Sequence, residues 1–249
     1  MEFNNKQLST GAVSEKDSLR IALLKFISCI AVIYIHSYTP QYAAFGNAVK
    51  TLPLFSGVAE FIAQYAARVA VPVFFCVSGV IYFSKQYEIS AGRFAHRKAR
   101  SILVPFLIWN TLALAGIFAV QLVEPLRNIF PPDKVIANFD GTKWINAYAG
   151  LENDWYPFLY PLWFLPYLFA AFMIVHIFRK YFYKYDMLIW GLAGANLLFL
   201  SYKPVVEMAV NWGPFLRLLY ALSFFTLGRM LIKYQKAVDS SMVLSCSGI

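Results

Sequence analysis

Residues 57–83 read GVAEFIAQYAARVAVPVFFCVSGVIYF, and residues 21–36 read IALLKFISCIAVIYIH. Each stretch is apolar and long enough to cross a bilayer as a helix. Similar runs recur along the chain and predict six spans, at about 19–38, 57–84, 101–123, 161–181, 185–203 and 214–234. Because lipid offers no partner to exposed backbone groups, and barrel strands would be short and alternating, we expect an all-α, polytopic transmembrane helical bundle.

The composition and the placement of charge agree with this class. The 249-residue chain is 59% hydrophobic and 14% charged, whereas soluble domains carry about 25% charged residues. A net charge of +9 could indicate nucleic acid, but the basic residues alternate between connecting segments, fourteen on one set and five on the other. The positive-inside rule therefore predicts a cytoplasmic N-terminus and a cytoplasmic 85–100 loop, and we expect no nucleic-acid partner.

The predicted organisation has three parts. Residues 1–18 form a polar cytoplasmic tail, and residues 19–236 form the transmembrane domain, whose first helix is retained because no A-x-A-like cleavage site follows it. Residues 124–160 form a long external loop whose many aromatic residues are interpreted either as interfacial anchors or as a stacking surface for a sugar. Residues 237–249 form a C-terminal tail, either a natural end or the point where a longer protein was truncated or frame-shifted.

The cysteines give no metal or disulfide signature. Cys29 and Cys76 fall within apolar spans and Cys246 near the end of the sequence, with no CxxC spacing. We interpret them as small core residues, and no metal is expected.

Three ionisable side chains lie inside the first two spans, where hydrocarbon makes a charge costly unless it faces protein or water. Lys25 and His36 are eleven residues apart, so they share one helix face roughly 16 Å apart along the axis. His36 is a candidate general base, or an interfacial histidine with no chemical role. Lys25 is a candidate catalytic residue, or a side chain that extends to the inner surface.

Arg68 is the deepest of these charges. Pro72 follows four residues later and lacks the amide hydrogen that would bond the carbonyl of residue 68, so the helix is expected to kink there and to leave a free acceptor beside the guanidinium. A fixed charge beside a free acceptor predicts a binding site. The alternative is a structural ion pair with Glu60.

Further candidates follow the second span. Arg93, Arg97 and Arg100 lie at positions i, i+4 and i+7, one helical face that suits either phosphate groups or anionic lipid headgroups. Ser78 is assigned to the same donor-binding site, although Ser78-Gly79 also fits a packing point between helices. Arg217 is most simply an interfacial anchor beside Trp212.

Four segments in order resemble the membrane-bound acyltransferase 3 family of bacterial sugar and cell-surface O-acyltransferases. They are LLKFISCIAVIYIHS, RVAVPVFFCVSG, RKARSILVPFLIWN and PLWFLPYLF, and FFTLGRML is a weaker fifth match. The family's first helix places an arginine eleven positions before a histidine, and here Lys25 and His36 hold those positions. The chain departs from the family pattern at Ala22, at Lys25 and at Pro166, where acidic, arginine and basic residues are usual.

The resemblance implies a multi-pass O-acyltransferase of the bacterial cytoplasmic (inner) membrane, in a family with about ten spans. It implies transfer of an acyl group, usually acetyl from cytoplasmic acetyl-CoA, to a hydroxyl of an extracytoplasmic polysaccharide or sugar. As a hypothesis, Arg93, Arg97 and Arg100, which we call the arginine stripe, hold the coenzyme A phosphates. Lys25 and Arg68 line the path of the thioester arm and stabilise the oxyanion, and His36 is the general base. The rival hypotheses are a lipid-linked sugar transporter or flippase, and an inactive truncated remnant.

Overall fold

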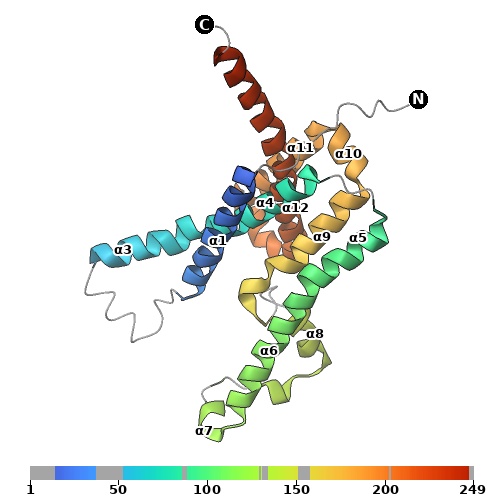
Figure 1. Cartoon of the computed structure of the whole chain (residues 1–249). Helices are drawn as coiled ribbons and strands as arrows, with labels where there is room; N and C mark the ends of the chain where they lie inside the picture. Colours follow the sequence, from blue (N-terminus) through green and yellow to red (C-terminus); the bar gives the residue numbers. More distant parts are fainter. Residues whose placement is uncertain are drawn as a thin grey trace. The chain divides into compact units, whose positions relative to one another are not determined.

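The structure, a computed structural model, describes residues 15–37, 53–85, 89–128, 130, 134–150, 158–201 and 203–246. The described residues form helices and turns, with no strand among them (Figure 1). The chain divides into two compact units. We call Met1–Glu88 with Leu222–Ile249 the terminal unit, and Ile89–Ala221 the central unit. The all-α expectation is confirmed.

The helices of the terminal unit are α1 (Glu15–Ser37), α3 (Pro53–Phe61), the π-helical η2 (Ile62–Ala66), the 3₁₀-helical η3 (Ala67–Val69) and α4 (Ala70–Ser84). Those of the central unit are α5 (Ala91–Lys98), the π-helical η4 (Ala99–Leu103), α6 (Val104–Gln121), α7 (Glu124–Arg127), η6 (Ile136–Asn138), α8 (Gly141–Ala149), η7 (Tyr160–Leu162), α9 (Phe164–Ile177), α10 (Arg179–Lys184) and α11 (Asp186–Ser201). Helix α12 (Lys203–Cys246) passes from the central unit into the terminal unit.

Five helical segments of the described chain are long and apolar enough to cross a membrane. They are Ser18–His36, Ala67–Ser84, Ala91–Gln121, Tyr160–Ile177 and Gly213–Tyr234. The predicted fifth span, 185–203, appears as the shorter apolar helix α11, which falls below this length. The prediction of a polytopic helical membrane protein is therefore confirmed, with five such helices rather than six.

Two glycines bring helices of the terminal unit into backbone contact. A Cβ atom built on Gly79 of α4 would lie 1.8 Å from the carbonyl oxygen of Phe225 on α12. A Cβ atom built on Gly228 would lie 2.6 Å from the carbonyl oxygen of Cys76. No side chain fits at either position, so the two helices cross where each lacks one. Buried aromatic rings surround the crossing, and the ring centroids of Tyr82 and Phe225 are 5.8 Å apart.

Small residues also mediate the contact between α1 and the following helices. Four buried alanines recur every three or four positions, at Ala59, Ala63, Ala67 and Ala70, and α1 packs against η2, η3 and α4. The Tyr34 hydroxyl donates a hydrogen bond of 3.3 Å to the Ala59 carbonyl. Short side chains allow close approach, which is the usual means of packing helices in a bilayer.

The central unit uses buried amide side chains instead. Asn110, fully buried on α6, donates from Nδ2 to the Ala147 carbonyl at 2.9 Å and accepts from the Leu159 amide at 2.8 Å. Eleven residues later, Gln121 donates to the Lys134 carbonyl at 3.0 Å and accepts from the Ile136 amide at 2.9 Å. Each amide satisfies one donor and one acceptor of the segment that follows α6. That segment is therefore bound along α6.

Two sequence interpretations differ from the structure, those of the 124–160 segment and of the C-terminal tail. The 124–160 segment, expected to be a loop, contains the helices α7, η6 and α8, and its buried residues pack against Leu114 of α6. The helical face predicted for the arginines of the 85–100 segment agrees with the structure, which is helical from Ala91 and continues into α6. Residues 237–246 of the expected tail extend α12. Aromatic and alternating apolar residues in these segments can be buried against a neighbouring helix, which a pass along one sequence does not show.

The interpretation of the cysteines as core residues is wrong for Cys29, which is exposed on α1, whereas Cys76 is half-buried. Cys29 lies among exposed apolar residues of the same helix, namely Leu23, Leu24, Phe26, Ile27, Ile30 and Ile33, so this part of the α1 surface is not packed within the terminal unit. Cys246 has no described side-chain environment.

Candidate functional site

Helix α1 carries two of the predicted site residues. Because α1 is continuous from Glu15 to Ser37, the eleven-residue spacing of Lys25 and His36 holds in the structure. Lys25 is half-buried and His36 is exposed. The turn that carries Arg68, η3, packs against α1. The terminal unit thus brings the Arg68 turn onto the helix that bears the other two candidates.

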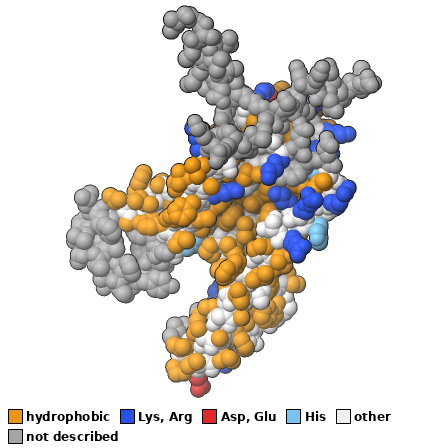
Figure 2. Space-filling model, viewed as in Figure 1, with side chains coloured by type: hydrophobic (Ala, Val, Ile, Leu, Met, Phe, Trp, Pro, Cys, Tyr) orange, Lys and Arg blue, Asp and Glu red, His pale blue; other side chains and the backbone are white. Residues whose placement is uncertain are grey.

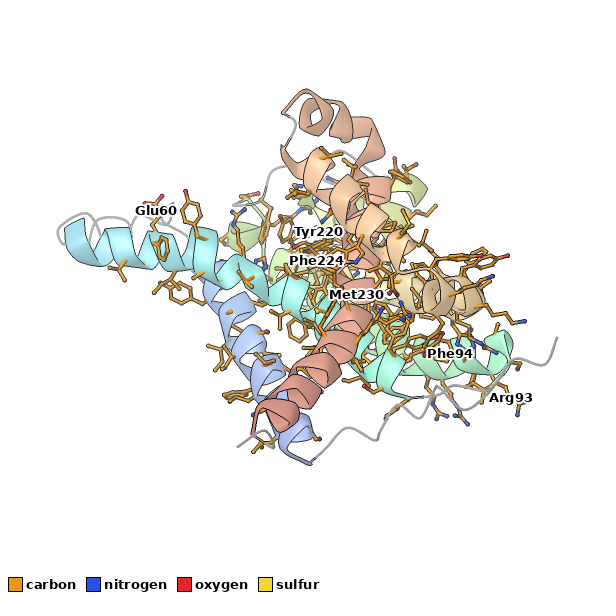
Figure 3. All side chains as sticks on the ribbon, turned by 90° about the horizontal axis from the view of Figure 1, so that it is seen from above. Glu60, Arg93, Phe94, Tyr220, Phe224 and Met230 are labelled. Atoms are coloured by element: carbon orange, nitrogen blue, oxygen red, sulfur yellow. The ribbon has the colours of Figure 1, made fainter. Side chains whose placement is uncertain are left out.

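The hydrogen-bonding pattern of the helix around Arg68 is irregular. The hydrogen-bonding pattern changes from α-helix to π-helix at Ile62, to 3₁₀-helix at Ala67 and back to α-helix at Ala70. Arg68 lies in the 3₁₀ turn and is exposed, and Glu60 is exposed on α3 (Figure 3). Mid-helix changes of this kind occur often at functional sites because they alter the direction of nearby side chains.

Ser78 is half-buried on α4, next to the glycine crossing. The packing interpretation of Ser78-Gly79 is confirmed for Gly79, whose position admits no side chain. Whether Ser78 contacts an acyl donor stays a prediction.

The basic helix α5 is fixed on α9 by one aromatic residue. Phe94 is buried and stacks on the His176 ring, with centroids 4.0 Å apart and planes 10° apart. The Lys98 ammonium lies 3.7 Å from the centroid of the Phe172 ring, a cation–π contact. Figure 3 shows Phe94 on the side of α5 towards α9 and Arg93 pointing elsewhere. This packing sets the direction of the arginine stripe.

His176 links the start of α5 to α9. Its Nε2 lies 3.2 Å from the Ile89 carbonyl and 3.4 Å from Nη1 of Arg179. Because a carbonyl only accepts, the contact with Ile89 needs a hydrogen on Nε2. In the other tautomer, the same nitrogen accepts a hydrogen bond from the Arg179 guanidinium.

The predicted arginine stripe is exposed. Arg93, Arg97 and Arg100 all lie on the surface of the central unit, and Arg93 Nε donates to the Ser90 hydroxyl at 3.4 Å. The π-helical η4 begins at Ala99, so Arg100 departs from the regular α-helical face assumed from the sequence. Along the α5–α6 helix, Lys and Arg side chains gather at the α5 end (Figure 2).

A cavity of about 340 Å³ lies elsewhere in the central unit, between α8, the start of α9 and the part of α12 near Pro214. Aromatic and proline side chains dominate its lining, among them Tyr148, Trp163, Pro166, Tyr167, Pro214 and Phe215. The guanidinium carbon of Arg217 lies 5.4 Å from the centroid of the Trp163 ring. Arg217 therefore contacts an aromatic residue of the cavity, whereas the sequence indicated an anchor beside Trp212.

Sequence reasoning missed the residues that organise these two regions. Asn110 was quoted at the end of a motif without a role, and His176 and Lys98 were not singled out. A polar amide in the apolar run of α6 was an available signal, because a buried polar side chain needs a partner. No local pattern signals the stacking of Phe94 on His176. Among the described residues, no three His, Cys, Asp or Glu side chains gather in a way that could hold a metal ion.

These features define a multi-pass α-helical membrane protein with an exposed basic helix and an aromatic cavity. The chain matches the family described as "Acyltransferase domain" over residues 19–249. It belongs to this family, the acyltransferase 3 family, and the sequence resemblance is confirmed.

One curated relative is the "Succinoglycan biosynthesis protein ExoH" of Rhizobium meliloti (strain 1021), 26% identical over 151 residues. The match covers 59% of this chain and 38% of the relative. The chain thus matches well under half of that relative's length. No solved structure was found to match the chain.

Proposed function

We propose that the chain is an integral membrane O-acyltransferase that moves an acyl group, taken as acetyl, from cytoplasmic acyl-CoA to a hydroxyl of an extracytoplasmic polysaccharide or sugar. The observation that carries the proposal is the family match over residues 19–249. The relative named for succinoglycan biosynthesis supports a polysaccharide as the class of acceptor. Its partners would be membrane lipid, acyl-CoA and the glycan.

The proposed orientation has the N-terminus and α5 at the cytoplasmic face of a bacterial inner membrane. The gathering of basic side chains at the α5 end of the α5–α6 helix supports it (Figure 2), since positive charge accumulates on cytoplasmic segments. In this orientation α8 lies towards the outer face.

The donor would be bound through its phosphates by Arg93, Arg97 and Arg100. All three are exposed on a helix that Phe94 holds firmly against α9. Arginine suits this role because its fork of N–H groups matches phosphate oxygens. Ser78 is retained as a second proposed donor contact.

In the proposed reaction, the acceptor hydroxyl oxygen attacks the thioester carbonyl. The new C–O bond forms, the C–S bond breaks, and the hydroxyl proton passes to His36 and then to the coenzyme A thiolate. Lys25 and Arg68 stabilise the negative oxygen that develops at the carbonyl. The packing of the Arg68 turn on α1 supports grouping these residues.

The reaction is tested with protein reconstituted in vesicles, radiolabelled acetyl-CoA outside or inside, and the host's surface polysaccharide as acceptor. We expect free thiol to appear only when both substrates are present, with label on the glycan. A transporter would accumulate glycan without acyl-CoA, and that result would contradict the proposal. Neither release nor accumulation would favour the inactive remnant.

The base is tested with His36→Ala. We expect turnover to fall by about 10²-fold or more, as general bases typically contribute. His96→Ala is the matched control, because His96 is an exposed histidine of α5 with no proposed role. Wild-type turnover in His36→Ala would exclude the assignment.

The donor site is tested with a triple Arg→Gln variant at Arg93, Arg97 and Arg100. Competition with free coenzyme A should show weaker donor binding, with acceptor binding unchanged. The control is a triple variant with Arg127, Lys134 and Lys180 changed to Gln. These residues are also exposed, so the control loses the same amount of charge at other places. Equal weakening in both variants would reduce the stripe to a general electrostatic effect.

A further inference from the structure

The cavity of the central unit has walls that are fixed by specific contacts. Trp163 and Tyr167 lie on successive turns at the start of α9, with ring centroids 5.9 Å apart in an edge-to-face arrangement of 64°. Arg217 lies over the Trp163 ring and reaches it from α12, the helix that forms another wall. A cation over the face and an aromatic edge at its side leave the indole few orientations.

The wall from α8 is fixed as well. The Tyr148 hydroxyl and the Thr111 hydroxyl of α6 are 2.8 Å apart, in hydrogen-bonding contact. The neighbouring Asn110 side chain donates a hydrogen bond to the carbonyl of Ala147, the residue before Tyr148. It also accepts a hydrogen bond from the amide of Leu159, the residue before η7. The aromatic wall is thus anchored to α6 from both sides, and the cavity is a built feature of the fold.

The lining favours a ligand with one flat apolar face and a polar edge. Rings of Tyr148, Trp163, Tyr167 and Phe215 offer π faces, whose negative potential attracts the slightly positive C–H groups of a neighbouring molecule. The lining also includes two tyrosines, Tyr148 and Tyr167, whose hydroxyls can both donate to and accept from the hydroxyls of a ligand.

We propose that this cavity binds a pyranose ring of the acceptor glycan, stacked on Trp163. A pyranose combines a face of axial C–H groups with a rim of hydroxyls, which matches the lining. A hydrocarbon chain has neither a flat face to stack on these rings nor hydroxyl groups to meet the tyrosine hydroxyls. The volume, about 340 Å³, lies within the range of about 300–1,000 Å³ found for small-molecule sites.

This inference rests on the proposed function and names the acceptor-binding residues for it. In the proposed orientation α8 and the start of α9 lie on the outer side, where the glycan would be met. Trp163, Tyr167 and Tyr148 are assigned to acceptor binding, and Arg217 is a positioning residue that acts through Trp163.

The test uses saturation-transfer difference NMR on the protein in lipid nanodiscs, without acyl donor. The probes are the methyl glycosides of glucose, galactose and mannose, and empty nanodiscs are the blank. We expect transfer to the ring C–H protons of at least one glycoside. Trp163→Leu should weaken that binding about tenfold, and Trp163→Phe should restore most of it. Trp144→Leu is the matched control, since Trp144 is an exposed residue of α8 outside the lining.

Hydrogen exchange at the Leu159 amide, which Asn110 holds, reports whether Trp163→Leu still folds. Protection as in the wild type together with weakened glycoside binding supports the proposal. If no glycoside gives a Trp163-dependent signal, the proposal is overturned. It is also overturned if a photoreactive phosphatidylcholine chain labels Tyr167 or Phe215 and no glycoside displaces it.

The two proposals fail separately in these experiments. Acyl transfer that persists at a wild-type acceptor KM in Trp163→Leu would contradict the cavity alone. Glycoside binding that is retained in a protein with no acyl transfer would contradict the enzymatic function alone.

Discussion

The terminal unit and the central unit hold their helices together by opposite means. In the terminal unit, side chains are absent at the crossing of α4 and α12, and backbone meets backbone at Gly79 and Gly228. In the central unit, two long amide side chains of α6 reach across to the backbone of the following segment. Packing through small residues depends on volume, whereas packing through amides depends on hydrogen bonds. The two units should therefore fail under different substitutions.

The largest effect is expected from Gly228→Leu. The added side chain meets the backbone of Cys76 and Val80, which cannot move aside as a flexible side chain does. We expect a loss of about 3 kcal/mol or more, seen as aggregation in detergent by size-exclusion chromatography. Gly116→Ala is the control, because a Cβ at Gly116 meets nothing within 4 Å. A Gly228→Leu protein as monodisperse as the control would refute the close crossing.

Asn110→Leu should have the next largest effect. It removes two buried hydrogen bonds and leaves the Ala147 carbonyl and the Leu159 amide without their partner, at a cost of about 1–3 kcal/mol each. Hydrogen exchange at Leu159 should become fast while Ile136 stays protected. The terminal unit should keep its wild-type behaviour. Unchanged exchange at Leu159 would show that Asn110 does not hold this segment.

Gln121→Leu tests the other buried amide side chain. We expect it to lower the free energy of unfolding by less, about 1–2 kcal/mol, because Gln121 is the last residue of α6. Here Ile136 should lose its protection and Leu159 should keep it. The two variants serve as controls for each other. If either one deprotected both amides, the 134–160 segment would behave as one cooperative unit rather than as two separate attachments.

Thr111→Val should have the smallest effect, about 0.5–1.5 kcal/mol, since it removes one exposed hydroxyl contact with Tyr148 and keeps the shape of the side chain. Its sharper readout is function. If the cavity binds the acceptor, KM for the glycan should rise while KM for acyl-CoA stays the same. A change in donor KM instead would argue against the assignment of this wall.

Much of the candidate site could be expected from the sequence, and the reason differs for each residue. The spacing of Lys25 and His36 needs only a continuous helix. Pro72 indicates a disturbed helix near Arg68 because it lacks an amide hydrogen, but the sequence predicted a kink there and not the π-helical and 3₁₀ turns of the structure. The exposure of the arginine stripe follows from its charge. The cation–π contact of Arg217 with Trp163 could not be expected, since it joins residues far apart in the chain.

The sequence by itself determined the class of fold and the family. The fold class follows from hydropathy and from the placement of basic residues, which reflect how each segment taken alone partitions between water and lipid. The family follows from motifs whose residues and order match the acyltransferase 3 pattern. Only the tertiary structure decided that the 124–160 segment contains the helices α7, η6 and α8 and is attached to α6, and that Gly79 and Gly228 meet α12 and α4. It also decided that aromatic residues of three helices line one cavity. These features depend on contacts between distant segments, and a contact has no signature in either segment until the two are packed together.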